Sequence, residues 1–574
     1  MFSNLPTDYR EFVHWLWPQF EPYYQDLIDR PLKADNLAEW LADWTRIGRT
    51  VQETYARLQL TTALNTADAE AEKHYFTFLG EVYPQVEATE QKLKQKLLAS
   101  GLEPTGFEIP LRNMRTEAAL FREANLPLLA EDRKLGSQYD KIVGAQTVQW
   151  EGQEIPLPQL RPIYQNPDRA VRERAWRLAA ERWLADRAAI NELWAKLFAV
   201  RKQIAANADC ADYRSYKWRE LLRFDYTPDD CTTFQQAIEE VAVPAATRVY
   251  ERARKRLSVD TLRPWDLDYD LYPVHTQALR PFHDVEELVS KIAAIFQHVD
   301  PQLGEYYVTM QREQLLDLDN RKGKAPGGFC TEFHVAQQPF IFFNVVGLRS
   351  DVLGILHEAG HAFHVFERKH LPYIQQTQVT MEFAEVASMS MELLAAPYLL
   401  DKYGGFYSAA DAARVFVEQL EEIILFWPFM AIVDAFQHWV YTSPDGGDPA
   451  QWEAKWTELC RRFTPGVDWS GLDDALVTGW HRKVHLYSAP FYYVEYGFAQ
   501  LGAVQVWRNA LQDQASSLAN YRKALSLGST RSLPELYQAA GAKFAFDAGA
   551  LREAIGLIES VIEQQLAAQS NIDV

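Results

Sequence analysis

Helical periodicity is the feature that most limits what this chain can fold into. Residues 166–208 read NPDRAVRERAWRLAAERWLADRAAINELWAKLFAVRKQIAANA, which predicts one or two long helices. Asn166 is placed to cap the first turn, and Pro167 suits the first helical position. The last 60 residues also have a helical pattern. An apolar stripe near the N-terminus has the three- or four-residue spacing of one helix face: Trp40, Trp44, Ile47, Val51, Tyr55 and Leu58. We therefore expect a mainly α protein.

The length of the chain sets its domain organisation. With 574 residues it is too long for one compact core and long enough for two or three packed units. It is 48% hydrophobic and 24% charged, the balance of a globular protein. We place the boundary near residue 190, which gives domains 1–190 and 191–574.

Charge and cysteine usage exclude several classes of protein. The net charge of −20 argues against a nucleic-acid partner, which requires clustered Lys and Arg. The four cysteines show no C-x-x-C spacing, so they form neither a disulfide framework nor a cysteine metal site. The N-terminus lacks the pattern of a signal peptide, and no run of 18 uncharged apolar residues predicts a membrane span. We expect a cytoplasmic protein without a membrane partner.

A β-hairpin is predicted within the helical pattern. Two β-prone runs, 329–335 and 340–346, flank Gln337-Gln338-Pro339, which we expect to form the turn. Gly327 and Gly328 lead into the hairpin, where another backbone could approach closely. A second, shorter hairpin is predicted at TVQWEGQEIPL, with its turn at Glu151-Gly152.

The stretch HEAGHAFH, residues 357–364, follows the longer hairpin and indicates a metal site. It lies in a predicted buried helix, where His357 and His361 are four residues apart and share one face. Glu358 lies 100° round the helix, close enough to touch a water on the metal without binding the metal. This is the arrangement of H-E-x-x-H zinc sites. A buried helix rarely carries such polar groups without a partner, because each costs burial energy.

A third ligand is required, because catalytic zinc normally has three protein ligands and a water. Glu367 is excluded, because it lies about 15 Å along the helix from His357. The next predicted helix, MEFAEVASMSMELLAAPYLL, carries Glu382, Glu385 and Glu392 roughly on one face. Periodicity does not choose among these three. A solvated stripe remains an alternative for Glu382 and Glu392.

The motif HEAGHAFH and the later FAEVAS, with 23 residues between His361 and Glu385, together resemble the thimet oligopeptidase and oligoendopeptidase F family of zinc peptidases. The resemblance implies one zinc ion per chain and Glu385 as the third ligand. His364 matches a family histidine that packs behind the metal ligands. The segment KAPGGF…PFIFFN is similar to the family's hairpin, whose edge strand pairs with a bound peptide. Gly327 and Gly328 would then help to bind substrate.

A second chemical segment, HLYSAPFYYVEYGFAQLGA, begins at His485. Such aromatic stripes are usually core. In the family, however, a histidine followed by a tyrosine cluster faces the zinc, where phenol or imidazole groups can stabilise an oxyanion. This chain has one extra residue between the histidine and the cluster. Tyr492 and Tyr496 match best as catalytic groups with His485, and Tyr493 is a further substrate-binding candidate.

The resemblance implies a mainly α fold of two helical halves around a deep substrate channel, with a small sheet beside the active-site helix. It implies an oligoendopeptidase F-like helical domain at 1–190 and a catalytic domain at 191–574. The expected activity is cleavage of internal bonds in short unfolded peptides by a monomer or homo-oligomer. Two alternatives remain open: a zinc carboxypeptidase or dipeptidyl carboxypeptidase, and a peptide-binding protein with a relic site. The presence of Glu358 argues against the relic.

Overall fold

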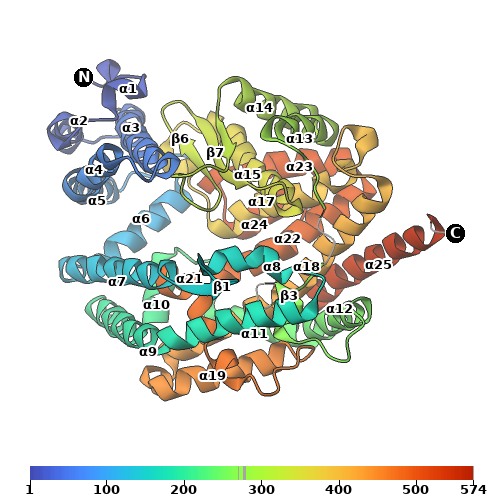
Figure 1. Ribbon diagram of the computed structural model, residues 1–574. Helices are drawn as coiled ribbons and strands as arrows, with labels where there is room; N and C mark the ends of the chain where they lie inside the picture. The colour runs from blue at the N-terminus through green and yellow to red at the C-terminus, as the bar shows by residue number, and fades with distance from the viewer. Residues whose placement is uncertain (269–270, 276–278, 573–574) are drawn as a thin grey trace. The chain divides into compact units, whose positions relative to one another are not determined.

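The computed structural model describes residues 1–268, 271–275 and 279–572. Helices dominate these residues, which confirms the mainly α prediction (Figure 1). They form two compact units, each built from three separate stretches of chain. Unit 1 comprises Met1–Ala119, Arg280–Ala412 and Gly502–Phe544, and unit 2 comprises Leu120–Leu279, Ala413–Leu501 and Ala545–Val574. The boundary expected near residue 190 falls inside a helix, and the proposed 1–190 and 191–574 domains stay a prediction.

Unit 1 holds the predicted metal motif. Its N-terminal core packs around the expected tryptophan stripe, since Trp40, Trp44, Ile47 and Val51 are each at most 1% exposed. Its elements are α1 (Tyr9–Phe12), α2 (Trp17–Asp29), α3 (Leu37–Leu64), α4 (Ala69–Thr77), α5 (Tyr83–Ser100), α6 (Glu108–Leu120), α13 (Val285–Val299), α14 (Pro301–Arg312), β5 (Leu316–Asp319), β6 (Phe329–Phe333), β7 (Gln338–Val345), α15 (Arg349–Glu367), α16 (Ile374–Thr377), α17 (Met381–Ala395), α23 (Gln514–Ser526) and α24 (Leu533–Ala539).

Unit 2 holds the predicted tyrosine segment. Its elements are α7 (Leu126–Gly144), β1 (Thr147–Trp150), β2 (Gln153–Pro156), α8 (Arg161–Tyr164), α9 (Arg169–Asn207), α10 (Tyr213–Glu220), α11 (Pro228–Ala237), α12 (Val243–Arg256), β3 (Leu267–Asp268), β4 (Tyr272–Pro273), α18 (Ala409–Thr442), α19 (Pro449–Phe463), α20 (Asp473–Val477), α21 (Val484–Ser488), α22 (Tyr493–Gln512) and α25 (Ala548–Ile572). The chain passes from one unit to the other five times, within α6, α18 and α22, between residues 279 and 280, and between residues 544 and 545.

The long predicted helix is α9, which runs unbroken for 39 residues. Its cap differs from the expectation, because Asp168 occupies the N-cap and accepts a hydrogen bond from the backbone of Ala170. The Asn166 side chain instead accepts from the backbone of Asp168, one step before the helix. The short hairpin is confirmed as β1 and β2, with Glu151 and Gly152 both at positive φ in its turn.

The longer hairpin is confirmed with a shifted turn. Phe333 pairs with Gln338 and Glu332 pairs with Pro339, so Gln338 and Pro339 belong to β7. Residues 334–337 make the turn, and Gln337 has a φ of 52°. The prediction of a Gln337–Pro339 turn was wrong because proline is tolerated in a strand where it need not donate a hydrogen bond.

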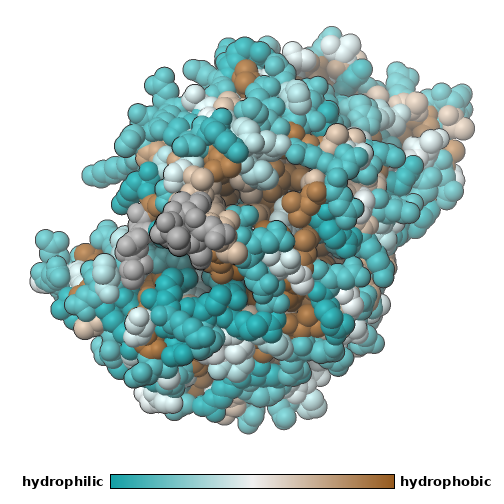
Figure 2. Space-filling view, turned by 90° about the vertical axis from the view of Figure 1, so that its right-hand side faces the viewer, coloured by the Kyte–Doolittle hydropathy of each residue, from teal (hydrophilic) through white to brown (hydrophobic). Residues whose placement is uncertain are grey.

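α18 is long and apolar enough to cross a membrane by composition, with a mean hydropathy of 1.4. Its most apolar window is 83% buried inside the structure. A core helix of a globular protein can have the length and hydropathy of a membrane span for this reason. The face shown in Figure 2 is mainly hydrophilic, with scattered hydrophobic patches.

Candidate metal centre and tyrosine cluster

The metal motif lies on α15, which begins directly after β7. The buried Asp351 carboxylate accepts hydrogen bonds from the backbone N–H groups of Val346, Gly347 and Leu348, at 2.7, 2.7 and 2.9 Å. One carboxylate thus satisfies three donors that precede the helix, and its charge suits the helix N-terminus. This fixes the start of α15 against the end of the sheet (Figure 1).

α15 and α17 approach each other unusually closely at Gly360, inside the motif. A Cβ at this position would lie 2.6 Å from Ser388 Cα and 2.7 Å from Ala387 O. Only glycine leaves room for this backbone-to-backbone contact. The contact aligns the histidine face of α15 with the acidic face of α17.

The structure brings His357, His361 and Glu385 together. One ligand atom from each lies within 4.8 Å of the others. Glu385 Oε2 is 3.2 Å from His357 Nε2 and 3.7 Å from His361 Nε2. Ligand atoms about 2.0–2.2 Å from a tetrahedral zinc ion lie roughly 3.3–3.6 Å from one another. The donor types and their separations therefore fit a zinc ion with three protein ligands.

Two further side chains orient these donors. Glu392 Oε1 is 2.8 Å from His357 Nδ1, so this carboxylate accepts the proton of the nitrogen that faces away from Glu385. The Ser388 hydroxyl donates to Glu385 Oε2 at 2.9 Å. Sequence periodicity placed Glu392 on the correct face, but nothing in the pattern indicated its contact with His357. Glu382 is 3% exposed, so the solvated stripe expected as an alternative is wrong at this position.

The charges of the three donors depend on one another. Burial alone would lower the pKa of His357, but hydrogen bonds to Glu385 and Glu392 outweigh it and raise this pKa well above its usual value. Burial alone would raise the pKa of Glu385, yet His357 and His361 lower it to about 2. Burial lowers the pKa of His361 to about 4. The Glu385 carboxylate thus attracts positive charge to the point where the two imidazoles approach it, and a metal cation would supply that charge.

Glu358 lies beside the donors and against the hairpin. It is 9% exposed, and its carboxylate accepts a hydrogen bond from the backbone N–H of Cys330 on β6. Burial raises its pKa to about 7, against the charge of His357, which lowers it. A carboxyl group with such a pKa can both take up and release a proton near neutral pH.

His364 is buried one turn beyond His361. It is 4% exposed and lies against the ring of Phe383 on α17, with ring centroids 6.0 Å apart. Burial lowers its pKa well below the usual value, so the ring is neutral. His364 is not among the three donors that converge, and its expected role behind the metal ligands stays a prediction.

The hairpin lies against α15 in a mixed sheet of order β5-β7-β6. Within the described residues β6 has a strand partner on one side only, which leaves it an edge strand. Asn344 donates to the carbonyls of Ala325 and Gly327, at 2.7 and 2.9 Å, and so fixes the loop that enters β6. Gly327 has a φ of 97°, and a Cβ on Gly328 would lie 2.2 Å from the Phe343 ring. Gly327 is therefore required by its backbone conformation, and Gly328 by the Phe343 ring that packs against it.

The predicted tyrosine cluster forms within unit 2. The ring of His485 lies 5.9, 5.0 and 6.2 Å from the rings of Tyr492, Tyr493 and Tyr496. Tyr492 and Tyr496 contact each other edge to face at 5.1 Å. Burial, with the charge of Lys483, lowers the pKa of His485 to about 4, so the imidazole is neutral at pH 7.

A second group of potential ligands in unit 2, Cys231, Asp434 and His438, is buried. Arg214 Nη1 lies 3.3 Å from His438 Nδ1. A guanidinium only donates hydrogen bonds, so Nδ1 accepts and Nε2 carries the proton. Nε2 lies 3.5 Å from Asp434 Oδ2 but makes no hydrogen bond among the described residues. With Nδ1 accepting from Arg214, the neutral ring offers no lone pair to a metal.

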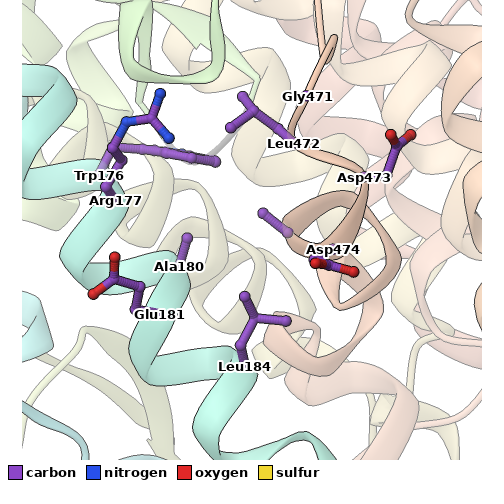
Figure 3. A pocket seen from close by; sticks show the side chains of 10 residues that line it. Trp176, Arg177, Ala180, Glu181, Leu184, Gly471, Leu472, Asp473 and Asp474 are labelled. Atoms are coloured by element: carbon purple, nitrogen blue, oxygen red, sulfur yellow. The ribbon is translucent and has the colours of Figure 1, made fainter.

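A surface pocket of about 440 Å³ in unit 2 lies between α9 and the start of α20 (Figure 3). Trp176, Ala180, Leu184 and Leu472 form its apolar wall. Of its carboxylates, Asp473 is paired with Arg461 at 2.7 Å. The residues that line it include no histidine or cysteine, so it lacks the donor set found on α15 and α17.

Comparison with known proteins agrees with this geometry. The chain matches peptidase family M3 over residues 163–556. It is 24% identical to oligopeptidase PepF of Bacillus subtilis (strain 168) over 247 residues, which cover 42% of this chain and 36% of that protein. It is 24% identical to an oligoendopeptidase F homolog of Borreliella burgdorferi over 305 residues, covering 50% and 48% of the two chains. The chain thus spans less than half the length of these two curated relatives.

A solved structure of Pz peptidase A with an inhibitor resembles the whole chain. The TM-score is 0.87 at 26% identity, and the match covers 98% of this chain and 99% of that one. The family match extends over more than half of the sequence and includes both the α15–α17 donor set and the tyrosine segment. The expected resemblance is confirmed: the chain belongs to peptidase family M3, a family of metallopeptidases.

Proposed function

We propose that this chain is a zinc-dependent endopeptidase that hydrolyses internal bonds of short unfolded peptides. The observation that carries the proposal is the convergence of two imidazoles and one carboxylate at tetrahedral spacing, with Glu358 beside them. His357, His361 and Glu385 would hold one zinc ion per chain. When bound, the metal supplies a Lewis acid that polarises the scissile carbonyl and lowers the pKa of a water molecule.

In the proposed reaction, Glu358 removes a proton from the attacking water and passes it to the leaving amine. Its backbone partner on β6 holds the carboxylate in place, and its raised pKa suits both transfers. His485, Tyr492 and Tyr496 are proposed to donate hydrogen bonds to the oxyanion of the tetrahedral intermediate, and Tyr493 to contact the substrate.

The position of β6 at the edge of its sheet supports the choice of peptides as substrates. An extended peptide can add to a free strand edge through main-chain hydrogen bonds, which tolerate many side chains. Gly327 and Gly328 lie where the loop enters this strand and are proposed to contact substrate; the space beside Gly327, where an added Cβ would meet nothing within 4 Å, agrees with this. A cytoplasmic location remains a prediction from the sequence.

The experiment that tests the proposal combines metal content with peptide cleavage. An internally quenched peptide of about ten residues, with its C-terminus amidated, is digested before and after chelation, and the products are identified by mass. One zinc per chain, internal cleavage, and recovery of activity with added zinc are expected. Cleavage that requires a free C-terminal carboxylate would instead identify a carboxypeptidase. Bound zinc without cleavage of a peptide mixture would identify a peptide-binding protein.

A further inference from the structure

The segment that carries the tyrosine cluster contains a strained residue. Phe491 lies between α21 and α22, is fully buried, and has a φ of 65°. A bulky side chain avoids this left-handed conformation, which persists only where surrounding contacts impose it. Tyr492 follows immediately, so the backbone of Phe491 sets the direction in which that tyrosine leaves the segment.

Buried side chains hold both peptide groups of Phe491. Its N–H donates to Gln437 Oε1 on α18 at 2.6 Å, and Gln437 is 1% exposed. Its carbonyl accepts from Arg223 Nη2 at 2.6 Å. The ring packs edge to face against Trp218, with centroids 6.0 Å apart. These contacts come from two different parts of unit 2 and together define the conformation of Phe491.

Arg223 also binds the residue that precedes Tyr496. Its Nη2 donates to Glu495 Oε1 at 2.5 Å, and the two side chains are 1% and 4% exposed. Arg223 Nη2 therefore donates both to the carbonyl of Phe491, just before Tyr492, and to the carboxylate of Glu495, just before Tyr496. Trp218 covers the guanidinium from one face at 4.5 Å. A buried charge held this way is costly to move, because both partners would lose their hydrogen bonds.

A second buried arginine holds the other end of the same segment. Arg201 is fully buried and donates to the carbonyls of Leu486 and Tyr487, the two residues after His485. The backbone between the histidine and the tyrosines is thus fixed by side chains at both ends. A core aromatic stripe would need packing alone, whereas this segment has its carbonyls held by charged groups.

We propose that Arg223 is a positioning residue, which with Gln437 and Glu495 fixes the directions of Tyr492 and Tyr496. This inference rests on the proposed function, in which those tyrosines stabilise the oxyanion. Arg223 acts through the tyrosines and does not itself touch substrate. Removing Arg223 should therefore lower kcat by about as much as removing a tyrosine hydroxyl, and the two reductions should not be additive.

A double-mutant cycle tests this on the full-length zinc enzyme. Tyr496→Phe and Arg223→Met are each expected to lower kcat about 10²-fold, with KM and zinc content unchanged. The combined variant should lose only a few-fold more than either single variant, because a misdirected Tyr496 has little left to contribute. Arg223→Lys, which can still donate to both oxygens, should recover most of kcat. Additive losses, near 10⁴-fold in the double variant, would overturn the proposal.

Arg172→Met provides the matched control, since Arg172 forms an equally buried pair with Asp266 at 2.8 Å in the same unit. Arg172→Met should leave kcat within about twofold of wild type. If Arg172→Met instead lowered kcat, and that loss were not additive with the loss in Tyr496→Phe, the proposal would be overturned. If Arg223→Met does not fold, Glu495→Gln replaces it in the double-mutant cycle, because glutamine keeps the shape of the glutamate side chain. If Tyr496→Phe has full activity, this inference fails together with the oxyanion role of Tyr496, while zinc binding and the loss of activity in Glu358→Gln still test the endopeptidase itself.

Discussion

The hydrogen bond between His357 and Glu392 gives a prediction about metal affinity that is separate from catalysis. Glu392 Oε1 accepts from His357 Nδ1 at 2.8 Å, which turns Nε2 toward Glu385 and the metal. Removing such an outer carboxylate typically costs 10–100-fold in metal affinity, or about 1.4–2.7 kcal/mol. His357 and Glu392 are 24% and 22% exposed, so solvent partly screens the pair. We expect a loss of about 10–30-fold for Glu392→Ala.

Glu392→Gln should cost less, about 3–10-fold, because the amide oxygen can still accept the Nδ1 proton while the charge is lost. Competition with a chromophoric chelator at pH 7.5 measures the dissociation constant directly, whatever the activity. Ser390→Ala is the matched control on α17, since the buried Ser390 hydroxyl has no hydrogen-bond partner among the described residues. A zinc affinity of Glu392→Ala within twofold of wild type would refute the orienting role.

Three further predictions concern the base, the helix contact and the buried histidines. Glu358→Gln should retain zinc and lose about 10²–10⁴-fold in kcat; near-full activity would remove Glu358 from the mechanism. Gly360→Ala should lower stability by about 1–3 kcal/mol and weaken zinc binding, because the new methyl overlaps the backbone of α17. Gly556→Ala, whose Cβ meets nothing within 4 Å, should stabilise the protein instead, by roughly 0.5–1 kcal/mol in thermal unfolding. Burial lowers the pKa of His481 to about 3 and of His485 to about 4. Both are protonated only after unfolding between pH 6.5 and 4. The part of the unfolding free energy that depends on these two histidines is therefore constant above pH 6.5 and falls below it by about 1.4 kcal/mol per pH unit and histidine. Denaturant titrations at pH 7, 6 and 5 should show a shallower slope for His481→Gln, and an unchanged slope would contradict the assignment.

The fold and part of the site could be predicted because their signals are local. The helical spacing of α3 and α9 is visible within one segment, and so is the i, i+4 spacing of His357 and His361. The turn of the longer hairpin was misplaced because Pro339 has the composition of a turn but sits in β7 opposite Glu332. Local chemistry favours a turn there, and the register of the sheet decides otherwise.

The remaining features depend on residues far apart in the sequence. The clamp around Phe491 joins positions 223, 437 and 495, and each of them alone has the appearance of an ordinary arginine, glutamine or glutamate in a helical pattern. A positive φ at a phenylalanine has no sequence signal, because the same residue is compatible with any extended or helical conformation. Such contacts become visible only once the helices are packed.

The choice of Glu385 over the other two acids of α17 follows from this packing. Gly360 contacts the backbone of Ala387 and Ser388, so the part of α17 that meets the two histidines is the turn that carries Glu385. Glu392 is seven residues further along, two helical turns on the same face, where its carboxylate reaches the opposite nitrogen of His357. One face of one helix therefore contacts both nitrogens of His357, Nε2 through Glu385 and Nδ1 through Glu392. In the sequence, this arrangement is visible as the seven-residue spacing of Glu385 and Glu392. The spacing can be interpreted only once the contact at Gly360 shows which turn of α17 meets the histidines.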